Sequence, residues 1–247
     1  MQRSPIVYFL FFMSGVTALI YEIVWTRMLT LVFGHTVFSV SVVLAAFMAG
    51  LGFGSYLFGY AVDKLSANSV DSSTALQLYG WIEIMIFASG AVLSLLFANF
   101  AEIYSLFHSA VPESPPIQNL LKVIFSFTLI LVPTTFMGAT LPLISKYCVM
   151  DNKRIGTQVS LLYALNTLGA ASGCMITGFF LMGTFGVLQT VLMAAACNLF
   201  IGISALSIYK ENGGTIKFSL PTINFPKLRW SPEQKFWMGI SFICGFT

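Results

Sequence analysis

The chain has 247 residues, of which 57% are hydrophobic and 9% are charged, and its formal net charge is +3. A soluble domain carries about a quarter charged residues, so this composition excludes a water-soluble globule and makes lipid the main solvent. Closed barrels need alternating segments of about ten residues, which the sequence lacks. We therefore predict an all-α, multi-pass protein whose first partner is the lipid bilayer.

Six segments are apolar over the length of about 20 residues that a helix needs to cross a bilayer. We predict spans over residues 6–33, 36–62, 74–100, 117–144, 157–182 and 187–209. The last two come from one stretch, 155–209, which contains no charge and is too long for a single crossing. We place the turn between them at GTFG, residues 183–186.

The end of the chain resembles its beginning. Residues 210–235 are polar and rich in Lys and Arg, which predicts a basic cytoplasmic linker, and residues 236–247 are apolar again. FFMSGVT (11–17) and SFICGFT (241–247) share identical residues at three positions, although chance similarity between apolar helices is the alternative. Repeats of six spans occur in transporters, so we predict half of a major-facilitator-like architecture, the start of a seventh span, and a chain that is cut short.

Positive charges predict the orientation. With the N-terminus in the cytoplasm, the outer connections 34–36, 101–118 and 183–186 contain no Lys or Arg. Two of the twelve basic residues, Arg27 and Lys122, lie near the outer ends of spans. The other ten fall on the cytoplasmic side: Arg3, Lys64, Lys146, Lys153, Arg154, Lys210, Lys217, Lys227, Arg229 and Lys235. Because cytoplasmic loops carry the excess of Lys and Arg, we predict a cytoplasmic N-terminus.

Glu22 is a carboxyl group at membrane depth in the first span. It lies about 24 Å along a helix that begins near Ile6, within a hydrocarbon core of about 30 Å. Arg27 lies about 32 Å along and can extend to the outer interface. Glu22 needs a proton, a partner or a water-filled cavity. Tyr21 and Trp25 flank it, and an aromatic ring beside a carboxylate suits an organic cation. A neutral, structural Glu22 is the alternative.

Glu83 is a second carboxyl group, about 14 Å into the third span and close to the bilayer midplane. Arg27 and Lys122 are the two basic residues that could reach toward it. Two carboxyl groups at depth with few cationic partners indicate a site for protons or cationic ligands. The alternative is a protonated Glu83 that makes a hydrogen bond between helices.

Small residues are spaced for close helix contact in two spans. Gly50 and Gly54 form a GxxxG pattern, and Gly169 and Gly173 form another, with Asn166 nearby to hydrogen-bond between helices. We interpret these primarily as packing surfaces, with a pathway lining as the alternative. Pro133 and Pro142 lie inside the fourth span and predict a kinked helix whose freed carbonyl groups need partners.

Several function classes have no support in the sequence. It contains no P-loop, no HExxH and no glycine-rich dinucleotide fingerprint. Its histidines, His35 and His108, fall in outer connections, and its four cysteines, Cys148, Cys174, Cys197 and Cys244, lack metal-ligand spacing. We therefore predict no catalytic residue, metal or cofactor in this chain. The basic linker is interpreted as a membrane anchor rather than a nucleic-acid site.

Four motifs resemble one known family. They are SGVTALIYEIVWTRML (14–29), AAFMAGLGFGSYLFG (45–59), PTTFMGATLPL (133–143) and LYALNTLGAASG (162–173). In this order they resemble the membrane domain of bacterial fused major-facilitator-like/spermidine-synthase-like proteins. The resemblance implies a bacterial inner-membrane location, a polyamine-type cation as partner, and signature residues Tyr21, Glu22, Trp25 and Arg27.

The same resemblance implies a cytoplasmic Rossmann-like aminopropyltransferase domain that uses decarboxylated S-adenosylmethionine and a polyamine acceptor. That domain and its catalytic residues are absent from these 247 residues, so we expect it downstream. The leading hypothesis is thus a membrane domain that handles or localises a polyamine-type cation. A proton-coupled transporter half and a non-catalytic anchor or scaffold are the alternatives.

Overall fold

The computed structural model describes residues 5–34, 36–67, 72–100, 114–149 and 155–214, and those residues contain helices and no strand. The helices are α1 (Pro5–Phe33), α2 (Thr36–Ala67), α3 (Ser72–Ala98), α5 (Pro115–Cys148), α6 (Ile155–Ile176), the π-helical turn η3 (Thr177–Leu181), α7 (Met182–Phe185) and α8 (Val187–Glu211). Six of the helical stretches are long and apolar enough to cross a membrane, with α6, η3 and α7 counted as one. The predicted all-α, multi-pass class is confirmed.

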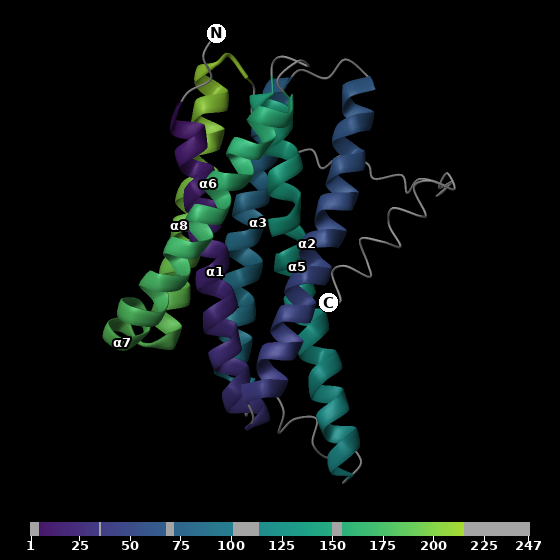
Figure 1. Ribbon diagram of the computed structural model, residues 1–247, viewed down its shortest axis with the longest axis vertical. Coiled ribbons are helices and arrows are strands. Elements are labelled where there is room, and N and C mark those ends of the chain that lie inside the picture. Colours follow the sequence, from purple (N-terminus) through teal and green to yellow (C-terminus); the bar gives the residue numbers. More distant parts are fainter. Residues whose placement is uncertain (1–4, 35, 68–71, 101–113, 150–154, 215–247) are drawn as a thin grey trace.

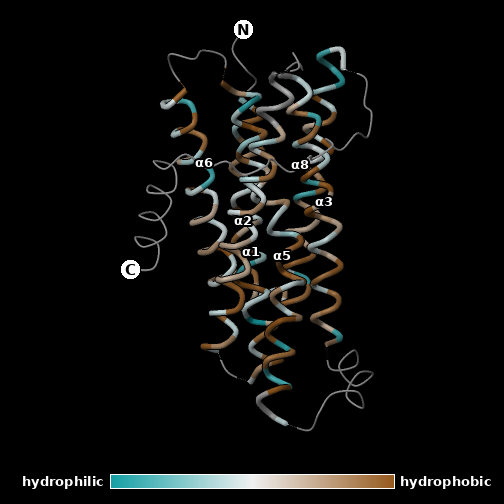
Figure 2. The backbone as a smooth tube through the Cα atoms, turned by 90° about the vertical axis from the view of Figure 1, so that its right-hand side faces the viewer, coloured by the Kyte–Doolittle hydropathy of each residue, from teal (hydrophilic) through white to brown (hydrophobic). Residues whose placement is uncertain are grey.

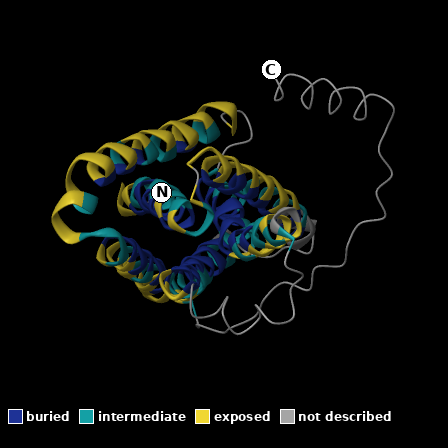
Figure 3. Cartoon of the chain, turned by 90° about the horizontal axis from the view of Figure 1, so that it is seen from below, coloured by how far each residue is buried: buried dark blue, intermediate teal, exposed yellow. Residues whose placement is uncertain are grey.

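The helices form one elongated bundle in which α1 is central (Figure 1). α1 packs against α2, α3, α5, α6 and α8, and its membrane-crossing window is the most buried of the six. The stretch from α6 to α7 is the least buried and packs mainly on α1. Apolar residues occupy most of each helix (Figure 2), and exposed residues lie on the outer sides of the bundle (Figure 3). This pattern is expected when the outer surface faces lipid.

Glycines bring three pairs of helices into close contact. On α6, a Cβ at Gly169 or Gly173 would overlap the backbone of α1 at Phe12 or Val16. On α3 and α8, Gly80 and Gly202 face each other. Close backbone approach of this kind is how small residues stabilise helix association in lipid, where no hydrophobic force acts between helices.

The third pair is α2 with α5. A Cβ at Gly50 would overlap the Thr134 side chain, and one at Gly54 would overlap the Thr135 carbonyl group. Gly52, on the same helix, has no atom within 4 Å of the position its Cβ would take. The close contact with α5 is therefore made by the face of α2 that carries Gly50 and Gly54, and Gly52 lies on another face.

Helix α5 continues through both of its internal prolines, Pro133 and Pro142. A proline has no backbone N–H, so Pro142 leaves the carbonyl group of Gly138 without its helical donor. The Ser55 hydroxyl on α2 donates to that carbonyl oxygen at 2.8 Å. A side chain of the neighbouring helix thus satisfies a backbone acceptor that the proline frees.

The turn between the last two long helices falls at Gly186, the last residue of the GTFG motif. Helix α7 continues through Phe185, and the chain reverses at Gly186, whose φ of +80° favours glycine. The π-helical turn η3, which directly precedes α7, has no counterpart in the sequence prediction. Inside this turn the hydroxyl of buried Thr177 donates to the Gly173 carbonyl oxygen at 2.7 Å.

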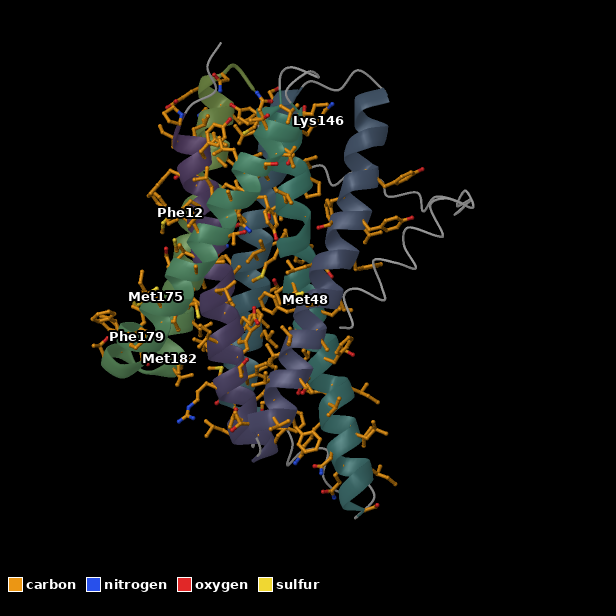
Figure 4. The ribbon with its side chains drawn as sticks, viewed as in Figure 1. Phe12, Met48, Lys146, Met175, Phe179 and Met182 are labelled. Atoms are coloured by element: carbon orange, nitrogen blue, oxygen red, sulfur yellow. The ribbon has the colours of Figure 1, made fainter. Side chains whose placement is uncertain are left out.

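Some sequence predictions concern residues outside the described ranges. These are the linker beyond residue 214, the start of a seventh span at 236–247, most of the outer connection 101–118, and His35, His108 and Cys244. Among the described basic residues, Lys146 lies at the end of the bundle where α1 begins (Figure 4).

Candidate functional site

A cavity of about 130 Å³ lies where α1 meets α2, α5, α6 and α8. Its polar lining consists of Ser14, Thr17, Glu22, Thr140, Asn166 and Asn198, and its apolar lining includes Phe47, Met48, Leu51 and Met137. Met48, labelled on α2 in Figure 4, lines the cavity and is also 58% exposed. The cavity therefore lies close to the outer surface of the bundle on the α2 side.

Glu22 is the one acidic residue among those that line this cavity. It is half-buried, and among the described residues no side chain pairs with its carboxyl group. Arg27 is exposed, and no ion pair joins it to Glu22 within the described part of the chain. An unpaired carboxyl group beside hydroxyl and amide groups can hold a small cation.

Glu83 lies deeper and is fully buried between helices. Its Oε2 accepts a hydrogen bond of 2.6 Å from the Asn198 side-chain amide on α8. The hydroxyl groups of Ser14 and Tyr79 also face this carboxyl group. Glu83 Oε1, Asn198 Oδ1 and the Tyr79 hydroxyl are buried and have no hydrogen-bond partner. This is a dense polar cluster with unused acceptors in an apolar bundle.

Asn198 and Ser14 connect the two carboxyl groups. Both residues line the cavity that contains Glu22, and both face Glu83. Ser14 precedes Glu22 by eight residues, so these two residues lie about 12 Å apart along the axis of α1. The cavity therefore borders the buried cluster around Glu83, and the Asn198 amide and the Ser14 hydroxyl belong to both.

The aromatic signature residues form a core rather than a cavity wall. Trp25 is fully buried, and its Nε1 donates to the Ser94 hydroxyl oxygen at 3.0 Å. Its ring lies 4.9 Å from that of Tyr21 and 6.1 Å from that of Phe47, between centroids. Of these three rings only Phe47 lines the cavity. An aromatic contact to a bound cation would therefore come from Phe47 on α2.

The remaining predicted residues lie around this centre. Asn166 lines the cavity and closely approaches Gly15 of α1. Gly50 and Gly54 contact α5, and Gly169 and Gly173 contact α1, each at a helix interface that borders the cavity. Pro133 and Pro142 lie on α5, on either side of Met137 and Thr140, which line it. Among the described residues, no three His, Cys, Asp or Glu are grouped to hold a metal.

A larger cavity of about 470 Å³ lies elsewhere in the bundle. Its lining is apolar apart from Lys122 and includes Met28, Phe97 and Phe100. Neither Glu22 nor Glu83 borders it, and residues 101–113, which follow Phe100, are outside the described ranges. The smaller cavity is the candidate site because the polar groups converge there.

Sequence reasoning did not identify four residues of this site: Ser14, Phe47, Tyr79 and Asn198. Asn198 gave a signal, because it is one of two side-chain amides, with Gln189, in the charge-free stretch 187–209. Tyr79 precedes Glu83 by four residues and so shares its helix face. Ser14 and Phe47 give no such signal, since their importance depends on how α1 and α2 are rotated in the bundle.

Two curated proteins are similar to this chain. They are polyamine aminopropyltransferase 1 and polyamine aminopropyltransferase 2 of Ralstonia nicotianae. Each is 24% identical over 204 residues, which is 82% of this chain but 34% of the first relative and 35% of the second. The chain therefore spans about a third of the length of these relatives. No family model matches the chain, and no solved structure matches it significantly.

Proposed function

We propose that this chain is a membrane domain that handles or localises a polyamine-type cation at the inner membrane of a bacterium. The observation that carries the proposal is the unpaired carboxyl group of Glu22 in a cavity lined by hydroxyl and amide groups. The names of the two relatives support the polyamine class of ligand. The distribution of Lys and Arg supports a cytoplasmic N-terminus.

The size of the cavity limits what it can hold. Pockets for drug-sized ligands measure about 300 to 1,000 Å³, and this one is about 130 Å³. We infer that it takes one ammonium end of a slender amine, with Glu22 as the counter-charge. Phe47 supplies an aromatic face beside that charge.

The test is spermidine binding to the purified chain in lipid nanodiscs, measured by calorimetry. Glu22→Gln removes the charge and keeps the shape, so we expect affinity to fall at least about tenfold, as for loss of a charged hydrogen bond. Glu211→Gln, at the exposed end of α8, is the matched control and should bind as the wild type does. Equal affinity in Glu22→Gln and wild type would reject the assignment.

A transporter half is the second candidate, and one observation favours it. The cavity borders α2 and α6, and exposed apolar side chains lie on α2, on α6 and on η3, which follows α6: Met48, Met175 and Phe179 (Figure 4). A second six-helix unit packed there would enclose the cavity. Uptake of labelled spermidine into liposomes that contain the whole natural protein would favour this candidate over simple localisation.

We also propose that an aminopropyltransferase-like domain follows in the natural protein, because the part that matches this chain is 35% or 34% of the length of the relatives that carry that name. The native coding sequence beyond codon 247 tests this directly. More spans followed by a Rossmann-like domain would support the fused arrangement. More spans without that domain would favour the transporter.

A further inference from the structure

We propose that Glu83 is a proton-binding site, and that a proton on Glu83 and a cation in the cavity exclude one another through Asn198. The first part concerns the buried cluster of Ser14, Tyr79, Glu83 and Asn198. The second part rests on the proposed function, because it takes an amine as the occupant of the cavity.

The cluster is sealed so tightly that only a proton fits. Glu83 is 0% exposed, and Glu83 Oε1, Asn198 Oδ1 and the Tyr79 hydroxyl have essentially no surface that a water molecule could touch. A bound water needs a cavity of its own and two to four polar partners. A metal ion or an ammonium group would need still more room. A proton needs none.

Hydrogen-bond chemistry also favours a proton at this carboxyl group. An ionised carboxylate can only accept hydrogen bonds, whereas a protonated one carries an O–H donor. Two buried acceptors of the cluster, Glu83 Oε1 and Asn198 Oδ1, have no hydrogen-bond partner in the structure, although the hydroxyl groups of Ser14 and Tyr79 face the carboxyl group. A proton on Glu83 turns one acceptor into a donor and removes a charge that is costly inside a membrane.

The groups that face Glu83 offer no cation to balance its charge. From α3 it faces Tyr79, from α1 it faces Tyr21, and from α8 it faces Cys197. From α5, Cys148 faces Tyr79. Among the described residues, no Lys, Arg or His forms an ion pair with Glu83. With no cationic side chain of the described residues acting on Glu83, a proton or a cation bound nearby in the cavity can supply the balancing charge.

The route of coupling is the side-chain amide of Asn198. It donates to Glu83 at 2.6 Å and also lines the cavity that holds Glu22. A cation there favours the ionised form of Glu83, so the exchange is Glu83–COOH plus cation giving Glu83–COO⁻ with bound cation plus H⁺. Linkage requires the effect to be reciprocal, and coupling between sites is typically about 5- to 150-fold.

The test is infrared spectroscopy of the full chain in lipid nanodiscs, with the carboxylic-acid C=O band followed against pH. We expect the wild type to show a band that Glu83→Gln lacks and that Glu22→Gln keeps. Glu83→Asp, which retains a carboxyl group, should show the band at a shifted position. The Asp variant keeps the test decisive if the Gln variant does not fold. A saturating amount of spermidine should reduce the band and release protons into a weakly buffered solution.

Two results would overturn the proposal. If wild type and Glu83→Gln give the same spectrum at every pH, Glu83 holds no proton. If spermidine binds but leaves the band unchanged, the cavity and Glu83 are not coupled. If spermidine does not bind at all, the proposed function fails and the coupling with it, while the band in the absence of ligand still decides the proton site.

Discussion

The Ser55 hydroxyl on α2 donates a 2.8 Å hydrogen bond to the carbonyl oxygen of Gly138 on α5. Pro142, four residues after Gly138, cannot provide the N–H that would otherwise bond this carbonyl group. The proline on one helix is therefore matched by a serine on another. This contact lies along the α2–α5 interface, which forms one side of the candidate cavity.

Replacing Ser55 with Ala should destabilise the bundle by about 0.6 kcal/mol, the average for hydrogen bonds between membrane helices, and by at most about 1.7 kcal/mol. The cause is an unsatisfied carbonyl group at Gly138. Unfolding in mixed micelles, followed by circular dichroism, measures the change. Ser207→Ala is the control, because the exposed Ser207 hydroxyl bonds only within α8. Equal losses in both variants would show that the contact between α2 and α5 contributes nothing specific.

Gly54→Ala should separate α2 from α5. A methyl group there meets the Thr135 carbonyl group and the Gly138 backbone, neither of which can move without shifting α5. Overpacking of this kind costs about 1 to 3 kcal/mol. Gly52→Ala adds the same methyl group on the open face of α2 and should be neutral or slightly stabilising, since Ala favours helix. The difference between their unfolding midpoints is the measurement.

Spermidine binding should depend on Phe47 more than on Trp25. Phe47 lines the cavity, whereas Trp25 is not part of the lining and donates a hydrogen bond to the Ser94 hydroxyl oxygen. We expect Phe47→Leu to weaken binding by roughly threefold to tenfold through loss of a cation–π contact. Trp25→Phe should leave the affinity unchanged and lower stability through the lost hydrogen bond. The reverse order in calorimetry would place the cation against Trp25 instead.

The Glu83–Asn198 pair should show strong coupling in a double-mutant cycle. Asn198→Leu leaves a buried carboxyl group without its donor, at a cost of about 1 to 3 kcal/mol. Glu83→Met removes the acceptor at a similar side-chain volume, so the hydrogen bond is absent in this variant as well. With both changes made, the Leu substitution should cost less than it does alone. Additive losses would mean that the 2.6 Å hydrogen bond contributes little to stability.

The sequence predicted the class of fold well because hydrophobic length is a strong signal. Within the described ranges, six stretches of suitable length and composition are present as helices. The prolines at 133 and 142 indicated that freed carbonyl groups would need partners, and Ser55 is one such partner. The sequence could not supply the identity of that partner, because Ser55 lies 83 residues away from Gly138 along the chain.

The site was harder to predict for the same reason. Glu22 and Glu83 are conspicuous as charges in apolar spans, but their different surroundings depend on helix rotation. Glu83 meets Asn198 across 115 residues of sequence, and no local spacing indicates that pairing. Trp25 is three residues from Glu22, so a shared face was a reasonable expectation. In the structure its ring lies against Tyr21 and Phe47 and does not reach the cavity.

The glycine contacts group the helices of the bundle into three closely packed pairs: α1 with α6, α2 with α5, and α3 with α8. Within each pair the two backbones are in close contact, so one helix cannot slide along the other without a steric clash. The cavity containing Glu22 lies where the first two pairs meet, and Asn198 of α8, in the third pair, also lines it. The volume of the cavity therefore depends on the angle between the α1–α6 pair and the α2–α5 pair. A small rotation of one pair against the other would open or close the cavity while the glycine contacts within each pair stay intact.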